Sequence, residues 1–126
     1  MANELILIVE DNPKNLKLVR DTLQVKGYQT IEAGTGEDGV QLAREQHPAL
    51  ILMDIQLPGI SGEEAFHQLR ADSVTHAIPV IAVTASVMAH DQKRIMAAGF
   101  DGFQGKPISV RELLDTVRQI LDKSPQ

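Results

Sequence analysis

Apolar and polar residues follow one another along this chain in blocks that predict strands and helices in turn. Three short runs are apolar throughout, at 5–9, 50–53 and 80–83. Continuous apolar runs of this length, rich in β-branched residues, indicate strands that are buried on both faces. A more polar run at 29–33 predicts a strand at the sheet edge, and the short segment 102–105 predicts the last one.

The segments between these runs have the apolar spacing of amphipathic helices. Their expected ranges are 13–26, 37–46, 62–71, 88–98 and 110–122. Asn12, Ser61 and Ser109 have the side chains that cap helix starts. The side chains expected on the inner faces of the first two helices are Leu16, Val19, Leu23, Val25, Val40, Leu42 and Ala43.

Strand and helix alternate five times, and the connections between them are short. Such alternation is the signature of an α/β fold, with a doubly wound five-stranded parallel sheet and helices on both faces. At 126 residues the chain is long enough for one domain with a real core.

Composition removes several classes of function. The net charge of −5 argues against nucleic acid as a partner, because phosphate backbones require a clustered basic surface. The chain has no cysteine, which excludes disulfides and thiolate chemistry. No apolar run is long enough for a signal peptide or a membrane span. We therefore expect a soluble cytoplasmic protein that has no membrane partner.

Chemically reactive side chains follow the apolar strands at the point where each strand ends. Glu10 and Asp11 follow the first strand, Asp54 ends the third, Thr84 ends the fourth, and Lys106 follows the fifth. The carboxyl ends of parallel strands meet at one edge, where ligands of doubly wound folds bind. Three carboxylates on one edge require a cation, and hard oxygen ligands suit Mg²⁺. This arrangement fits phosphoryl transfer onto the Asp54 carboxylate.

These residues belong to motifs that resemble the receiver domain of two-component response regulators. The matching pieces lie at 7–12, 53–58, 61–62, 83–85 and 106–107, in the family's order and spacing. Asn15 and the run 106–109 are similar to the single-domain regulators of the DivK type that act in cell division. The resemblance implies a flavodoxin-like strand order of 2-1-3-4-5, with a receiver domain at 1–123 and a C-terminal tail at 124–126.

The resemblance also implies roles for the residues at the sheet edge. Asp54 is then the phosphoacceptor, modified to 4-aspartylphosphate. Glu10, Asp11 and Asp54 hold Mg²⁺, together with the backbone carbonyl of Gln56.

A second set of implied roles concerns the response to the phosphoryl group. Thr84 and Lys106 contact it and are catalytic together with Asp54, and the Lys106–Pro107 peptide bond is cis. Thr84 and the aromatic residue Phe103 form the switch. Many family members have tyrosine where this chain has Phe103, which lacks a hydroxyl group.

Two other motifs fit the sequence less well. The run 34–39 matches the G-x-G-x-x-G pattern of dinucleotide-binding folds, but the strand before it is too polar for the central strand that carries this turn. Its glycines are better explained as turn and helix-start residues. Phosphatases of the haloacid type have a second acid two residues after the nucleophile, where this chain has Gln56.

The predicted function is that of a stand-alone response regulator. Such a regulator catalyses only its own phosphorylation and dephosphorylation, so it is not a conventional enzyme. Its donor is a histidine kinase or a histidine phosphotransfer protein, and its output passes to an allosteric partner protein or along a phosphorelay. Since only a few residues follow the last helix, no DNA-binding output domain is expected. The alternative is a flavodoxin-like interaction module that is never phosphorylated.

Overall fold

The computed structural model of the chain contains a five-stranded parallel sheet in the order β2-β1-β3-β4-β5. It describes residues 3–85 and 88–123. The strands are β1 (Leu5–Val9), β2 (Gln29–Ala33), β3 (Leu50–Asp54), β4 (Val80–Thr84) and β5 (Gly102–Gly105). The predicted fold class and strand order are confirmed. The expected tail at 124–126 lies outside the described residues.

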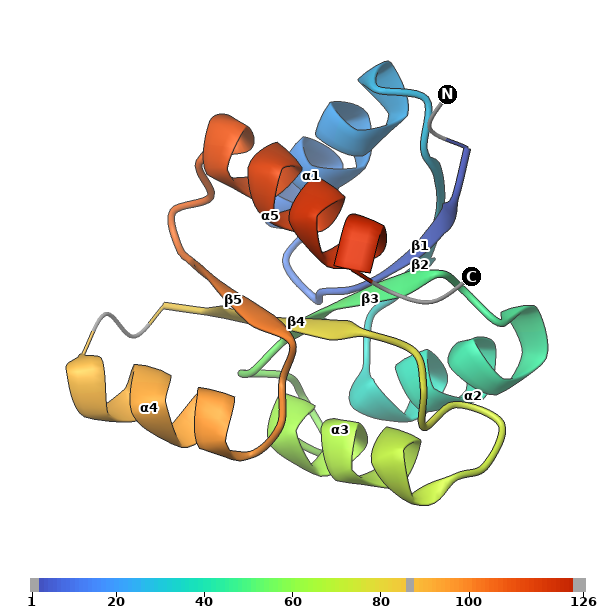
Figure 1. Cartoon of the computed structure of the whole chain (residues 1–126), viewed down its shortest axis with the longest axis vertical. Coiled ribbons are helices and arrows are strands. Elements are labelled where there is room, and N and C mark those ends of the chain that lie inside the picture. Colours follow the sequence, from blue (N-terminus) through green and yellow to red (C-terminus); the bar gives the residue numbers. More distant parts are fainter. Residues whose placement is uncertain (1–2, 86–87, 124–126) are drawn as a thin grey trace.

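A helix follows each strand, and the helices cover both faces of the sheet. They are α1 (Pro13–Val25), α2 (Gly36–Gln46), α3 (Gly62–Ala71), α4 (Ala89–Ala97) and α5 (Val110–Lys123). Figure 1 shows α1 and α5 on one face of the sheet and α2, α3 and α4 on the other. Within the described part of the chain, no helix combines the length and apolar character needed to cross a membrane.

Side-chain caps fix the starts of α1 and α3, near the carboxyl edge of the sheet. The Asn12 side chain accepts hydrogen bonds from the backbone amides of Lys14 and Asn15, and Ser61 accepts one from Glu64. These bonds satisfy amides that have no partner inside the helix. Helix α2 begins one residue before its expected start, because Thr35 caps it.

The sheet separates two hydrophobic clusters. Leu7, Met53 and Phe66 belong to the cluster under α2, α3 and α4. Ile8 and Leu113 belong to the cluster under α1 and α5. The larger members of both clusters are almost completely buried. The prediction that Val25 faces the core is wrong: it is the last residue of α1, and it is 83% exposed.

The glycines at 34–39 have a packing role. A Cβ atom added to Gly39 would lie 2.8 Å from a methyl carbon of Val9, so α2 rests directly on β1. One added to Gly36 would lie 2.7 Å from the side chain of Ile60. The two glycines let α2 approach β1 and the loop after β3 closely, which explains the motif without a nucleotide.

A polar cluster around Arg70 joins three parts of the chain on the α3 side. Its guanidinium donates to the carbonyl oxygen of Ile78 at 2.7 Å and to the carboxylate of Asp101 at 2.7 Å. The same Asp101 oxygen accepts a hydrogen bond from the backbone amide of Val80 at 2.8 Å. Arg70 also lies over the ring of Phe66, 4.7 Å from its centroid. The start of β4 is therefore tied to α3 and to the turn before β5.

Candidate functional site

Backbone hydrogen bonds align the segments that carry the polar side chains at the carboxyl edge of the sheet. The amide of Glu10 donates to Ala33, and the amide of Lys106 donates to Thr84, at 2.9 and 2.8 Å. Asp54 is the last residue of β3 and pairs with Val83 in the neighbouring strand. The parallel register therefore brings side chains that are distant in sequence to one place.

Lys106 lies between two buried carboxylates. Its Nζ atom is 3.0 Å from Oδ2 of Asp54 and 3.2 Å from Oε1 of Glu10. The Asp54 and Glu10 side chains are 4% and 5% exposed, and that of Lys106 is 19% exposed. Acids this deeply buried require charged or hydrogen-bonding partners, and Lys106 supplies one cation for both.

The titration of this group follows from its crowding. Burial raises the pKa of Glu10 above its usual value, and the adjacent Asp54 carboxylate raises it further. Burial alone lowers the pKa of Lys106, but its contacts with Asp54 and Glu10 outweigh this effect and raise the pKa. Lys106 is therefore held as a protonated cation beside the two acids.

A third acid, Asp11, completes a cluster that is open to solvent. Glu10, Asp11 and Asp54 each offer a carboxylate oxygen, and these oxygens all lie within 4.8 Å of one another. Asp11 is exposed, whereas the other two acids are buried. The set contains only hard oxygen donors and has an exposed side where water can complete the coordination. These properties fit Mg²⁺ and do not fit a thiolate- or imidazole-seeking metal.

The loop after β3 is held tightly against Asp54. The backbone amide of Gln56 donates to Oδ1 of Asp54 at 3.0 Å, and the amide of Gly62 donates to the carbonyl of Ile55 at 3.0 Å. A Cβ atom at Gly62 would fall 2.1 Å from the carbonyl oxygen of Asp54. The first residue of α3 must therefore be glycine. Its position directly after the Ser61 cap was visible in the sequence, but the backbone contact was not.

The residues expected to form the switch lie beside this cluster. Thr84 ends β4, is 4% exposed, and pairs with Gly105 of β5. Phe103 is half-buried and packs against the α2, α3 and α4 cluster. The Lys106–Pro107 peptide bond is cis. Glu10, Asp11, Asp54 and Lys106 are thus brought together. Phe103 pairs with Ala82 of β4, two residues before the pair of Thr84 with Gly105.

The arrangement suits nucleophilic attack by a carboxylate on an electrophile that carries negative charge. Asp54 offers an oxygen, the Lys106 ammonium lies next to it, and the cluster can hold a hard cation. Phosphoryl transfer is favoured by positive charge placed to neutralise the oxygens of the phosphoryl group in the transition state.

Sequence comparison identifies the family of this chain. The response regulator receiver domain family matches residues 6–118. The chain belongs to this family. It is 47% identical, over 116 residues, to the polar-differentiation response regulator DivK of Brucella ovis, a match that spans 92% of this chain and 94% of DivK. The expected similarity to regulators of the DivK type is confirmed.

Solved structures agree with this assignment. The receiver domain of the sensor histidine kinase PA1611 from Pseudomonas aeruginosa, solved with magnesium coordinated in its active-site cleft, is 31% identical with a TM-score of 0.89. The match covers 97% of this chain and 100% of that domain. A CheY-like receiver domain protein from Methanospirillum hungatei is 27% identical with a TM-score of 0.88, over 98% of this chain and 97% of its own.

Proposed function

We propose that this protein is a phosphorylation-controlled signalling switch in which Asp54 accepts a phosphoryl group. The observation that carries the proposal is the contact of Asp54 with Lys106, 3.0 Å apart, within a cluster of three acids. Asp54 is a buried carboxylate that lies between the Lys106 ammonium and the solvent-exposed acid Asp11. Such an arrangement is more typical of a functional site than of a purely structural ion pair.

The donor is a phosphohistidine of a histidine kinase or of a histidine phosphotransfer protein. An oxygen of Asp54 forms a bond to phosphorus, and the bond from phosphorus to the histidine nitrogen breaks. The electron pair stays on the imidazole, which takes up a proton. Lys106 stabilises the charge on the phosphoryl oxygens, and Thr84 donates a hydrogen bond to one of them.

The metal site belongs to the same proposal. Glu10, Asp11 and Asp54, with the backbone carbonyl of Gln56, would hold Mg²⁺. Bound there, Mg²⁺ neutralises negative charge on the acceptor and on the phosphoryl oxygens. Hydrolysis reverses the modification: water attacks phosphorus and the Asp54 carboxylate leaves.

The phosphoryl group adds about 1.5 to 2 negative charges at the sheet edge. Thr84 and Lys106 then shift toward the new oxygens, and Phe103 follows the space that Thr84 leaves. This movement biases the surface formed by α4, β5 and α5, which passes the signal to a partner protein or to the next phosphotransfer protein. Location in the cytoplasm stays a prediction.

The test uses acetyl phosphate and, separately, BeF₃⁻, each with Mg²⁺. Acetyl phosphate should add the mass of one phosphoryl group, and BeF₃⁻ should shift the NMR signals of residues around Asp54, Thr84 and Lys106. Asp54→Asn should abolish both effects, whereas Asp38→Asn, an exposed acid of α2, should retain them. If the wild-type protein shows no change that depends on Asp54, the alternative of an unphosphorylated interaction module is correct.

A further inference from the structure

A groove runs between α1 and α5 on the face of the sheet that these two helices cover. Its main hollow has a volume of about 790 Å³. The residues that define this α1–α5 groove are Lys26, Tyr28, Val110, Arg111, Leu114, Asp115 and Arg118. A second hollow of about 340 Å³ shares Lys26, Val110 and Leu114 with the first and extends the groove to Val25.

The groove leads away from the phosphoacceptor site. Tyr28 directly precedes β2, and Arg118 donates to the carboxylate of Glu4, which directly precedes β1, at 3.1 Å. Tyr28 and Arg118 therefore lie near the amino edge of the sheet, whereas Asp54 lies at the carboxyl edge. Phosphoryl chemistry at Asp54 does not explain this end of the groove.

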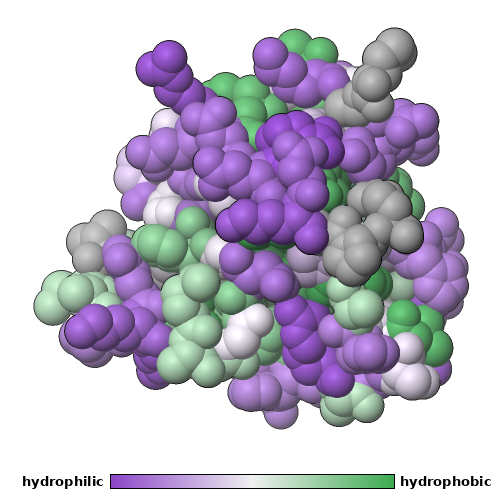
Figure 2. Space-filling view, viewed as in Figure 1, coloured by the Kyte–Doolittle hydropathy of each residue, from purple (hydrophilic) through white to green (hydrophobic). Residues whose placement is uncertain are grey.

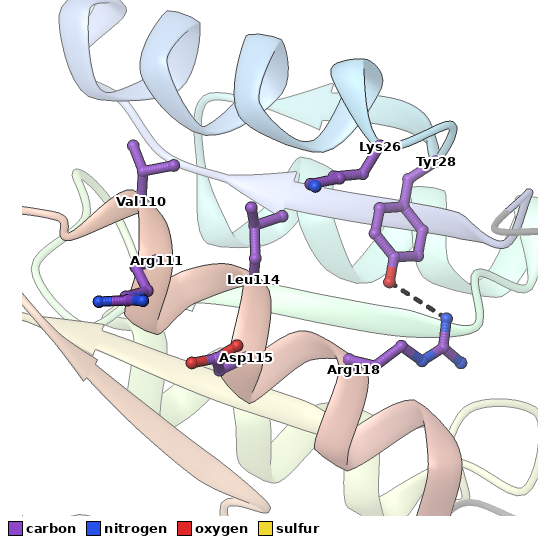
Figure 3. Close-up of a pocket in the computed structure, with 7 residues that line it drawn as sticks. All are labelled: Lys26, Tyr28, Val110, Arg111, Leu114, Asp115 and Arg118. Atoms are coloured by element: carbon purple, nitrogen blue, oxygen red, sulfur yellow. Dashed lines mark hydrogen bonds between the residues drawn. The ribbon is translucent and has the colours of Figure 1, made fainter.

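Two of the large apolar side chains that are exposed in the described part of the chain line the groove. Val25 is 83% exposed and Val110 is 44% exposed. Val110 and Leu114 are one helical turn apart, so they form an apolar ridge on α5, and Figure 3 shows both pointing toward α1. Figure 2 shows hydrophobic surface between hydrophilic side chains at the top of the view, where α1 and α5 lie in Figure 1. Exposed apolar clusters with a polar rim mark interaction surfaces.

The rim of the groove carries unneutralised positive charge in a chain whose net charge is −5. Among residues 3–85 and 88–123, neither Lys26 nor Arg111 forms an ion pair. Figure 3 shows Lys26 extending from the end of α1 into the space beside α5. Arg118 is already held by Glu4 and Asp122, and it also donates to the hydroxyl of Tyr28. Two acids also line the groove, Asp115 and Asp21, and Asp21 is already paired with Lys17. Lys26 and Arg111 therefore remain as available cations on either side of the apolar ridge.

We propose that the α1–α5 groove binds an amphipathic helix of a partner protein, with its apolar side chains against Val25, Val110 and Leu114 and acidic side chains beside Lys26 and Arg111. An apolar stripe between two helices accepts a third helix by side-chain interdigitation. A second copy of this chain fits the rim less well. A two-fold interface would gather the Lys26 and Arg111 side chains of both copies around one groove, between two chains of like net charge.

The experiment is an NMR titration of the ¹⁵N-labelled protein with a designed helical peptide of about 15 residues, long enough for about four turns. One face of the peptide carries leucine, and glutamate lies on both sides of it. A matched peptide has lysine in place of each glutamate. We expect saturable shifts at Val25, Lys26, Val110 and Leu114 with the acidic peptide, and weaker shifts with the basic one.

Variants of the protein test whether the peptide binds in the α1–α5 groove and whether the positive charges there contribute to binding. Lys26→Glu and Arg111→Glu should each raise the Kd of the acidic peptide by about tenfold at low salt. Lys93→Glu, on α4 at the opposite face of the sheet, should leave it unchanged. Asp54→Asn should also bind normally, and Lys26→Glu should still respond to BeF₃⁻, which separates this proposal from the proposed phosphotransfer.

Several outcomes would overturn the proposal. They are equal binding of the acidic and basic peptides, shifts centred on another surface, and no saturable binding. A concentration-dependent dimer in sedimentation experiments that disappears in Lys26→Glu would assign the groove to a second copy of the chain instead.

Discussion

Gly62 lies against the backbone of Asp54 so closely that a Cβ atom at position 62 would fall 2.1 Å from the Asp54 carbonyl oxygen and 2.8 Å from the Cα of Ile55. The first turn of α3 is thereby fixed to the strand that carries the candidate phosphoacceptor. A Cβ atom is fixed directly to the backbone, and the atoms that it would meet are backbone atoms too. No side-chain rotation can therefore relieve the clash.

Gly62→Ala is therefore expected to lower the free energy of unfolding by about 3 kcal/mol, the upper part of the range for overpacking. Urea unfolding followed by circular dichroism measures the change. The matched control is Gly34→Ala, where an added Cβ meets nothing within 4 Å. The control should be neutral or slightly stabilising. Equal destabilisation of both variants would contradict the contact.

Lys106→Met should destabilise the metal-free protein. It removes the cation that lies 3.0 Å from Asp54 and 3.2 Å from Glu10, and it leaves both buried acids without it. Because Lys106 is partly exposed, we expect a loss of about 3 kcal/mol, the lower end of the range for breaking a buried ion pair. Urea unfolding in EDTA tests this. Lys93→Met, an exposed position on α4, should change stability by less than about 0.5 kcal/mol.

Glu10→Gln should have the opposite effect at neutral pH. Burial, and then the adjacent Asp54, raise the pKa of Glu10 in the folded state above its usual value of 4.5. The folded protein therefore holds this proton more tightly than the unfolded chain does. Its favourable contribution is complete below pH 4.5 and is lost as pH rises through the folded-state pKa.

In metal-free buffer, Glu10→Gln should thus be more stable than the wild type at pH 7, and its advantage should shrink toward pH 4. Stability measured by urea unfolding across this pH range gives the comparison. Glu45→Gln, an exposed residue near the end of α2, serves as the control and should show no such trend. A stability difference for Glu10→Gln that is constant with pH would contradict the prediction.

Asp11→Asn should weaken Mg²⁺ binding about tenfold or more, because the cation prefers charged oxygen ligands and Asp11 is the solvent-facing acid of the cluster. Since the side chain is exposed, the free energy of unfolding without metal should change by less than about 0.5 kcal/mol. NMR titration with MgCl₂ measures the affinity. Asp38→Asn should bind Mg²⁺ as the wild type does.

Arg70→Met should reduce stability without affecting the phosphoacceptor site. The substitution leaves the Ile78 carbonyl and the Asp101 carboxylate without their guanidinium donor, a loss of about 2–3 kcal/mol for charged hydrogen bonds. Arg44→Met, which removes a more exposed ion pair with Asp72, should cost less than about 1 kcal/mol. Both variants should respond to BeF₃⁻ normally once they are folded.

The strands and the polar edge could be predicted from the sequence because each depends on a local pattern. The apolar runs that end in Val9 and Asp54 are short, continuous and followed by turn residues, so their burial leaves little choice of structure. The parallel arrangement then follows from the alternation with helices. Once the order of strands is fixed, Glu10 and Lys106 must reach the same edge as Asp54.

Other features could not be predicted, because they depend on distances between segments far apart in the chain. Val25 continues the apolar spacing of α1, but it lies at the last turn, where the helix has passed the edge of the core. The close contact of Gly62 with Asp54 and the shared position of Lys106 between two acids require the exact placement of loops. Neither leaves a periodic signal in the sequence.

The position of β3 within the sheet affects how easily the site can open by local unfolding. β3 lies between β1 and β4, and both of its faces are covered by hydrophobic clusters. Strands of this kind open only when the whole molecule unfolds, so their amide hydrogens exchange with solvent last. Asp54 is the last residue of this strand, whose amides we expect to exchange most slowly. Fraying of the edge strand β2 or of the outer helices therefore leaves the carboxylate in place.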